Sequence, residues 1–312
     1  MVEHRTAPRI VSAAALAGSL GMILAACTTA TGGAPASEPA YFGHVHGLGV
    51  DPATGTTYAA THNGVWVLPT AELPESYPAE GDDVEAPMQV AGRAQDTMGF
   101  VVGRPGLLLG SGHPDPAEQP DLNPPNLGLI SSTDGAATWE SVSLRGEVDF
   151  HDLETVELPD GELRIYGYDA TAGTVKTSSD SGRTWSAGAT LELRDLAADP
   201  TDPGRVYATT AQGLLVSNDA GGTFLPVSGA PALFLLTLAP GTGEFIGIDT
   251  EGRLWTSGDG AAWTERGQSS GAPHALAYVG GDAPWILIAD ERGVVASDDY
   301  GETVTELVSV QR

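Results

Sequence analysis

Histidine is scarce in this 312-residue chain, yet three of its seven histidines occupy one point of a repeated segment. The segment HVHGLGVDP (44–52) returns in part later in the chain, as FHDLETV (150–156), LRDLAADP (193–200) and PHALAYV (273–279). The equivalent positions are His46, His151, Arg194 and His274. Neutral imidazole binds Zn, Cu, Fe and Ni, and it also forms hydrogen bonds in polar pockets. The repeat therefore predicts either a transition-metal site or a hydrogen-bonding ligand pocket.

His44 and His46 form an H-x-H pair, which is a sharper signal than a single histidine. Residues i and i+2 of a strand point to one side at a spacing of roughly 6.6 Å, so that both can contact one ion. His62 and His113 follow two later strand-like runs, YAAT and LLLGSG. The candidate metal ligands are His44, His46, His113 and His151, with Zn or Cu as the ion. The wider ligand pocket adds His62, Arg194 and His274.

A second repeat predicts the fold. The pattern Ser-x-Asp-x-Gly-x-Thr-Trp occurs in five copies with aspartates 46, 39, 40 and 40 residues apart, namely Asp134, Asp180, Asp219, Asp259 and Asp299. In such a turn the aspartate accepts backbone N–H groups, the glycine takes a left-handed conformation and the aromatic ring packs between sheets. Ala136 replaces the glycine in the first copy, and the fourth copy is one residue short. A structural role is expected for all five aspartates.

Each repeat holds four short strand-like runs separated by turn residues, which is typical of one propeller blade. Six first strands can be recognised, HVHGLGV, GFVVG, FHDLETV, LRDLAAD, LFLLTLA and PHALAYV. We therefore predict an all-β fold, a single six-bladed β-propeller over residues 41–312. Two insertions interrupt the pattern. ELPESYPAEGDDVEAP (72–87) is expected to be a solvated loop, and SGHPDPAEQPDLNPPN (111–126) is expected to border the ligand site.

The strand order of a blade predicts where the histidines lie. The five Ser-x-Asp turns connect third and fourth strands, at the face opposite to the one where the first strands begin. The second strands end at the face where the first strands begin. The six histidines beyond residue 40 therefore map to one face, around the mouth of the central channel, where loops vary and ligands usually bind.

The Ser-x-Asp copies resemble the BNR or Asp-box repeat of sialidases and related six-bladed propellers. HVHGL (44–48), GSGHPDP (110–116) and FHDLE (150–154) are also similar to a family of bacterial lipoproteins filed with the glycosyl hydrolases. The resemblance covers nearly all of residues 41–312 and implies a sialidase-like propeller that binds, and in an enzyme also hydrolyses, a glycan. The arginine-isoleucine-proline signature of sialidases is absent.

Catalytic groups for such a reaction are numerous but not specific. Sialidases use a tyrosine nucleophile and three arginines, and here Tyr168 stands beside Asp169. The arginines on the predicted ligand face are Arg93, Arg145, Arg194, Arg253, Arg266 and Arg292. The carboxylates near strand ends at that face are Asp149, Asp152, Asp169, Asp249 and Asp290. With 41 acidic residues in the chain, several are expected there by chance, so no catalytic pair is assigned.

The N-terminal segment predicts the location of the protein. Residues 1–26 have the features of a lipoprotein signal peptide, with Arg5 and Arg9 before an apolar run that ends in LAAC. Cys27, the single cysteine, is the predicted lipidation site, and residues 27–40 have the composition of a flexible tether. We therefore expect a monomer in the cell envelope, anchored by its lipid on the outer side of the plasma membrane.

The formal net charge of −27 excludes nucleic acid as a partner and favours cations. Three functions remain open. A glycan-directed propeller follows from the resemblance, and a Zn or Cu lipoprotein follows from the histidines. A scaffold that docks a protein partner follows from the general use of propellers.

Overall fold

The structure is a computed structural model that describes residues 42–78 and 84–309. The predicted signal peptide, Cys27 and the tether lie outside the described residues. The described part forms six antiparallel sheets of four strands, each built from consecutive strands, and this confirms the predicted all-β six-bladed propeller. Helical structure in these residues is limited to the 3-10 turn Val90–Gly92, and none of it is long and apolar enough to span a bilayer.

The six blades follow one another along the chain. Blades 1 to 3 comprise β1 (Val45–Val50), β2 (Thr57–Thr61), β3 (Gly64–Val67) and β4 (Met88–Gln89); β5 (Asp96–Arg104), β6 (Leu107–His113), β7 (Leu129–Ser132) and β8 (Glu140–Ser143); β9 (Phe150–Glu157), β10 (Leu163–Asp169), β11 (Thr174–Ser178) and β12 (Ser186–Thr190). Blades 4 to 6 comprise β13 (Asp195–Ala198), β14 (Val206–Thr210), β15 (Gly213–Ser217) and β16 (Leu225–Pro226); β17 (Leu233–Leu238), β18 (Phe245–Asp249), β19 (Arg253–Ser257) and β20 (Thr264–Gln268); β21 (Ala275–Val279), β22 (Trp285–Asp290), β23 (Gly293–Ser297) and β24 (Thr305–Ser309).

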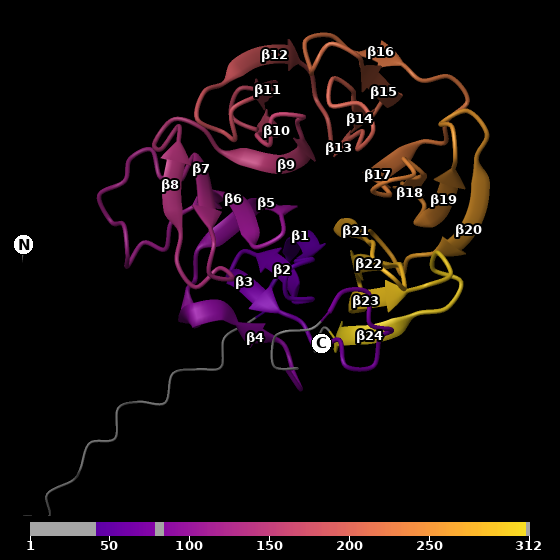
Figure 1. Ribbon diagram of the computed structural model, residues 1–312, viewed down its shortest axis with the longest axis horizontal. Helices are drawn as coiled ribbons and strands as arrows, with labels where there is room; N and C mark the ends of the chain where they lie inside the picture. The colour runs from indigo at the N-terminus through magenta and orange to yellow at the C-terminus, as the bar shows by residue number, and fades with distance from the viewer. Residues whose placement is uncertain (1–41, 79–83, 310–312) are drawn as a thin grey trace, which may run out of the picture. The chain divides into compact units, whose positions relative to one another are not determined.

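The first strand of every blade lies at the centre of the ring (Figure 1). Each first strand contacts the first strand of the next blade, and β1 contacts both β5 and β21, so the ring is closed. A cavity of about 270 Å³ runs between these strands and is lined by residues of all six. This central channel is the place where side chains from different blades meet.

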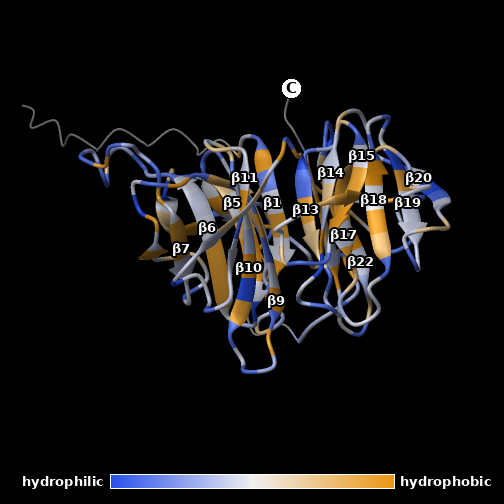
Figure 2. Cartoon of the chain, turned by 90° about the horizontal axis from the view of Figure 1, so that it is seen from above, coloured by the Kyte–Doolittle hydropathy of each residue, from blue (hydrophilic) through white to orange (hydrophobic). Residues whose placement is uncertain are grey.

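Burial explains the order of strands within a blade. β22 (WILIAD) is buried at every position, whereas β20 (TERGQ) exposes all its residues except the glycine. An apolar run buried on both faces is what a second strand requires, because it is packed between two neighbouring blades. In Figure 2 the hydrophobic colour follows the strands, and hydrophilic residues gather in the loops at their ends.

Blade 1 and blade 6 close the ring through side-chain packing. Val45 of β1 and Trp285 of β22 belong to one buried apolar cluster, together with residues of β2 and β23. No sheet of the described residues combines strands from both ends of the chain. Closure therefore depends on apolar contact between these two blades rather than on a shared sheet.

The insertion at residues 72–87 takes part in this closure. Leu73 and Tyr77 pack against the cluster that joins the two blades, and the hydroxyl of Ser76 donates a hydrogen bond of 2.5 Å to the carbonyl of Ala283 in blade 6. In Figure 1 this segment of blade 1 lies over the strands of blade 6. The prediction of a solvated loop was wrong for this first part, because its two apolar side chains find a buried surface that only the closed ring provides.

The Ser-x-Asp turns all connect the third and fourth strands of their blades. In blade 3, Ser178 donates to Asp180 at 2.8 Å and accepts the N–H of Gly182 at 2.8 Å. Asp180 also accepts the backbone N–H and the hydroxyl of Thr184, at 2.8 and 2.6 Å. These bonds, with those of Thr184 foremost, lower the pKa of Asp180 to about 2. The same network recurs after Ser132, Ser217 and Ser297, and a shorter one follows Ser257.

The glycine of this turn provides a test of the fold. Gly182 has a φ of 85°, and a Cβ added there would lie 2.1 Å from Cδ2 of the buried Leu129. We expect Gly182→Ala to lower the free energy of unfolding by about 2–4 kcal/mol, because left-handed strain adds to this clash. Urea denaturation measures the change. Ala136, which holds the equivalent position in blade 2 with a φ of 70°, provides the matched control. Ala136→Gly should change stability by less than about 1 kcal/mol, and an equally small effect of Gly182→Ala would contradict the explanation.

Candidate metal centre at the channel mouth

β-bulges explain how the repeated position aims side chains into the mouth of the channel. The pairing of β1 with β2 skips His46, which lies between two paired residues. The equivalent residues of three further blades are skipped in the same way, namely Met98, His151 and Phe234. Arg194 and His274 stand immediately before β13 and β21. A bulge bends the strand and redirects the extra side chain, and bulges are frequent beside functional sites.

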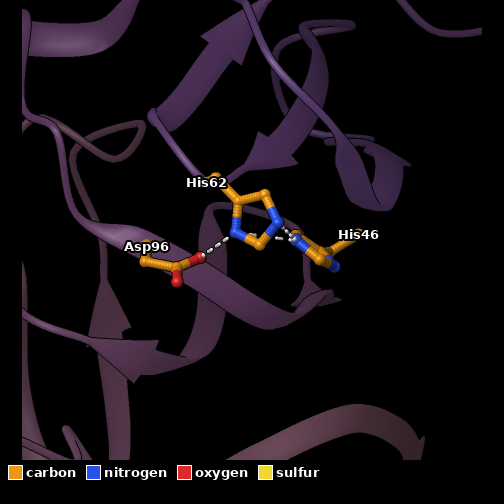
Figure 3. Close-up of side chains that lie close together, drawn as sticks. All are labelled: His46, His62 and Asp96. Carbon is orange, nitrogen blue, oxygen red and sulfur yellow. Dashed lines mark hydrogen bonds and ion pairs between the residues drawn. The ribbon is translucent and has the colours of Figure 1, made fainter.

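Three side chains from two blades meet at this mouth (Figure 3). His46 comes from β1, His62 directly follows β2, and Asp96 begins β5. Nε2 of His46 lies 3.2 Å from Nε2 and 3.3 Å from Nδ1 of His62, with the two rings nearly perpendicular. Nδ1 of His62 lies 2.8 Å from Oδ1 of Asp96. One ligand atom from each residue can be chosen so that all lie within 4.8 Å of one another, close enough that the three residues could hold one metal ion.

His44 and His274 extend the group of imidazoles toward blade 6. The ring of His44 lies 4.8 Å from that of His46 and 4.3 Å from that of His274, measured between centroids. His44 precedes β1 and a bulge lies at His46, so the expected regular H-x-H spacing within one strand is not present. The two rings are brought together by the bulge instead.

Burial and crowding keep these imidazoles neutral. Burial, then the nearby His274 and His62, lower the pKa of His44 to about 4. Burial, then the rings of His62 and His44, lower the pKa of His46 to about 3. The pKa of His274 is also lowered, chiefly by burial. At neutral pH these rings therefore carry free lone pairs that can accept a hydrogen bond or bind a metal.

A second group continues the contacts into blades 2 and 3. His113, the last residue of β6, is paired in register with Asp96, and its Nδ1 lies 3.5 Å from Oδ2 of that residue. Nε2 of His113 lies 3.5 Å from Oδ2 of Asp149, and Nε2 of His151 lies 2.8 Å from the same oxygen. Imidazoles and carboxylates thus alternate from His62 to His151 along the channel mouth.

Deeper in the channel, three carboxylates line the wall. Asp152, Glu154 and Asp195 each accept a backbone N–H from the first strand of the next blade, at Leu196, Ala198 and Leu236. Burial raises the pKa of all three, and that of Asp195 to about 6 despite the opposing influence of Arg194. These side chains therefore connect blades 3, 4 and 5, which assigns them a structural part at the channel wall.

The other predicted ligand-face residues form hydrogen bonds, ion pairs or ring contacts with groups outside the histidine cluster or, in the case of Arg194, with the backbone of His274. Arg194 reaches across the mouth, where Nη2 donates to the carbonyl of His274 at 2.9 Å and the guanidinium lies over the ring of Phe234.

The remaining predicted residues form contacts with their own neighbours. Ion pairs join Asp169 to Lys176, Asp249 to Arg253, Asp290 to Arg292 and Arg93 to Glu118. Arg145 donates a hydrogen bond to Gln119. Tyr168 donates to the carbonyl of Leu191 at 3.2 Å. Among the described arginines, Arg104 and Arg194 line the channel, so a three-arginine clamp is not formed there.

Asp96 was absent from the predicted site, and Asp149 was included only among several carboxylates. Both stand two residues before the repeated position, as His44 does before His46. Alignment of the repeats therefore places Asp96 and Asp149 at the position that His44 holds in blade 1. Acidic residues are common in this chain and their side-chain directions depend on the bulges, so this offset by itself does not identify ligands.

Comparison by sequence gives one partial match. No protein-family model matches the chain. A xyloglucanase of Hypocrea jecorina (strain QM6a) is 35% identical over 116 residues, which is 33% of this chain and 14% of that enzyme. The chain therefore spans a small part of the length of this curated relative.

Comparison by structure shows the same kind of propeller in proteins of different function. A GH74 enzyme of Niastella koreensis aligns with a TM-score of 0.52 at 17% identity, over 84% of this chain and 37% of that one. YCF48 bound to a D1 peptide aligns at 0.51 and 16%, over 84% and 81%. A chain of the nidogen/laminin complex aligns at 0.56 and 13%, over 82% and 93%. At these identities the likeness shows a shared propeller fold alone.

The channel wall leads to a prediction about pH. The pKa of Asp195 is about 6 in the folded chain, above the 3.8 of an unperturbed aspartate, so the folded state holds this proton more tightly. Stability should therefore fall as the pH rises from about 4 to 6, and Asp195→Asn should remove that loss. We expect Asp195→Asn to gain about 1–2 kcal/mol on wild type between pH 4 and pH 7, allowing for water in the channel. Urea denaturation across this range measures the gain, and the exposed Asp121→Asn is the control. A difference that does not change with pH would contradict the expectation.

Proposed function

We propose that this chain binds a transition-metal ion, Zn²⁺ or Cu²⁺, at the mouth of its central channel. His46, His62 and Asp96 are the ligands, and the single observation that carries the proposal is that their donor atoms lie within 4.8 Å of one another. Zinc and copper both accept imidazole nitrogen and carboxylate oxygen, at roughly 2.0–2.2 Å for zinc. Two imidazoles and one carboxylate leave a coordination position for water or a ligand.

The surroundings of the three ligands support this proposal. An ion bound by Nδ1 of His62 and Oδ1 of Asp96 would replace the contact of 2.8 Å that these two atoms now make with each other. His62 is 48% exposed, so an ion can enter from solvent without opening the fold. The net charge of −27 raises the local concentration of cations near the surface.

Metal binding can be measured directly on the full chain. We expect calorimetric titration with Zn²⁺ or Cu²⁺ to show binding that His46→Ala/His62→Ala weakens by about 100-fold or more, because two of three ligands are lost. Asp96→Asn keeps the size of the side chain but removes its charge, and it should weaken binding as well. Asp121→Asn, an exposed carboxylate outside the cluster, is the control and should bind as wild type does. Binding by wild type no stronger than by the double variant would refute the proposal.

Glycan binding is the second candidate, and the match to a xyloglucanase is the observation that favours it. In this reading the channel mouth is a saccharide site in which the histidines supply hydrogen bonds, and hydrolysis would need a carboxylate pair in addition. Titration of the same protein with xyloglucan oligosaccharides in the presence of a chelator separates the two candidates. Sugar binding without metal binding would replace the metal proposal with this one.

We further propose that the protein is a lipoprotein of the cell envelope, anchored through Cys27 on the outer side of the plasma membrane. The support is the sequence LAAC at the end of an apolar leader. Cys27→Ser removes the thiol that accepts the lipid, so we expect unprocessed precursor or protein released from the membrane fraction. Fractionation and mass spectrometry of the N-terminus measure this, with Thr28→Ser as the control. Unchanged processing and membrane retention in Cys27→Ser would contradict the anchor.

A further inference from the structure

His113 has a carboxylate on each side of its ring. Its Nδ1 faces Oδ2 of Asp96 at 3.5 Å, and its Nε2 faces Oδ2 of Asp149 at 3.5 Å. Asp96 belongs to the proposed metal site, whereas Asp149 is 6% exposed. The imidazole therefore stands between a carboxylate at the channel mouth and a buried carboxylate on its far side.

The main chain fixes His113 in this place. His113 ends β6 and is paired in register with Asp96 of β5. Gly112 allows the two strands to approach, because a Cβ there would lie 2.1 Å from the carbonyl oxygen of Asp96. On the other side, the fully buried Ser111 accepts the N–H of the residue that follows Asp149. The order carboxylate, imidazole, carboxylate is thus set by three neighbouring strands.

His113 reaches the proposed metal site through Asp96. Among the residues that the structure describes, His46, His62 and Asp96 form the set whose donor atoms are close enough together for one ion. Oδ1 of Asp96 faces His62 at 2.8 Å, and Oδ2, the other oxygen, faces His113. His113 therefore lies one contact away from the ion and acts on a ligand.

We propose that His113 is a positioning residue of the metal site, whose Nδ1 holds Oδ2 of Asp96 so that Oδ1 is presented to the ion. Asp149 in turn holds the ring of His113 at Nε2. Carboxylates that bind metal are themselves hydrogen-bonded by neighbours, and loss of such a neighbour typically costs about 10–100-fold in metal affinity. The inference rests on the proposed metal-binding function and extends it to the residues that orient a ligand.

The contact between His113 and Asp96 should shorten when an ion binds. At 3.5 Å it is longer than a hydrogen bond, whereas the contact of Asp96 with His62 is 2.8 Å. An ion on Oδ1 replaces the contact with His62 and leaves the carboxylate free to turn toward Nδ1 of His113. We expect a distance of about 2.8–3.0 Å between Nδ1 and Oδ2 in a crystal structure of the Zn²⁺-bound chain.

Two matched substitutions of His113 test the role of Nδ1. Asparagine places an amide donor near the position of Nδ1, and glutamine places one near the position of Nε2. In calorimetric titration of the full chain with Zn²⁺, we expect His113→Ala to weaken binding by about 10–100-fold and to leave one ion per chain. His113→Asn should restore most of the lost affinity, and His113→Gln should restore little of it.

Asp149 and an exposed aspartate of the same insertion complete the series. Asp149→Asn removes the charge that faces Nε2 of His113, so it should weaken binding, by less than His113→Ala does. Asp121→Asn should bind as wild type does, because Asp121 is exposed and lies outside the cluster. Thermal unfolding of each variant without metal verifies that it is folded.

A spectroscopic count of ligands distinguishes positioning from direct binding. Pulsed electron paramagnetic resonance of the Cu²⁺-loaded chain counts the imidazoles on the ion, and we expect two in the wild type and two in His113→Ala. Three in the wild type and two in the variant would make His113 a ligand and overturn its positioning role.

The remaining outcomes separate this inference from the function on which it rests. Wild-type affinity in His113→Ala would overturn the inference and leave the metal site in place. Equal losses in the alanine, asparagine and glutamine variants would also overturn it, because the effect would then not depend on a donor at Nδ1. Wild type without a bound ion would refute the proposed function and this inference together.

Discussion

The packing of blade 1 against blade 6 is the contact on which the rest of the molecule depends. Every sheet of the described residues is made of four consecutive strands, so no strand pairing ties the last blade to the first. Val45, Trp285 and their neighbours form the apolar interface instead, and Leu73 and Tyr77 of the first insertion add to it. Once the ring is closed, six first strands face one another across a narrow channel, and their side chains must be compatible there.

The channel combines structural and chemical roles at different depths. In its wall, Asp152 and Asp195 accept backbone N–H groups of the adjacent blades, so these carboxyl groups hold strands together. Their burial in the wall raises the pKa of both. At its mouth, the bulges turn histidines toward the axis, and closure brings His274 of blade 6 within 4.3 Å of His44. A group of imidazoles with carboxylates among them is the result, in a chain whose overall charge attracts cations.

The similarity to a xyloglucanase and to other propellers concerns the scaffold, and function in such folds depends on the residues at the mouth. The turn networks around Asp180 and its equivalents recur in blades 2 to 6, because these blades make the same tight connection between their third and fourth strands. The mouth does not recur in this way, since the repeated position is histidine in three blades and Met98, Arg194 or Phe234 in the other three. Sites of this kind are specified by the differences between repeats.

The repeats in the sequence determined the all-β class, the six blades and the position of the turns, because each local pattern satisfies backbone hydrogen bonds within a few residues. They also indicated that His46, His151 and His274 are equivalent. The tertiary structure decided which residues meet. His62 and Asp96 join His46 because bulges redirect side chains and ring closure sets the distances between blades. The packing of Leu73 and Tyr77 was likewise not predictable, since the surface that buries them is formed by blade 6, about 200 residues later in the chain.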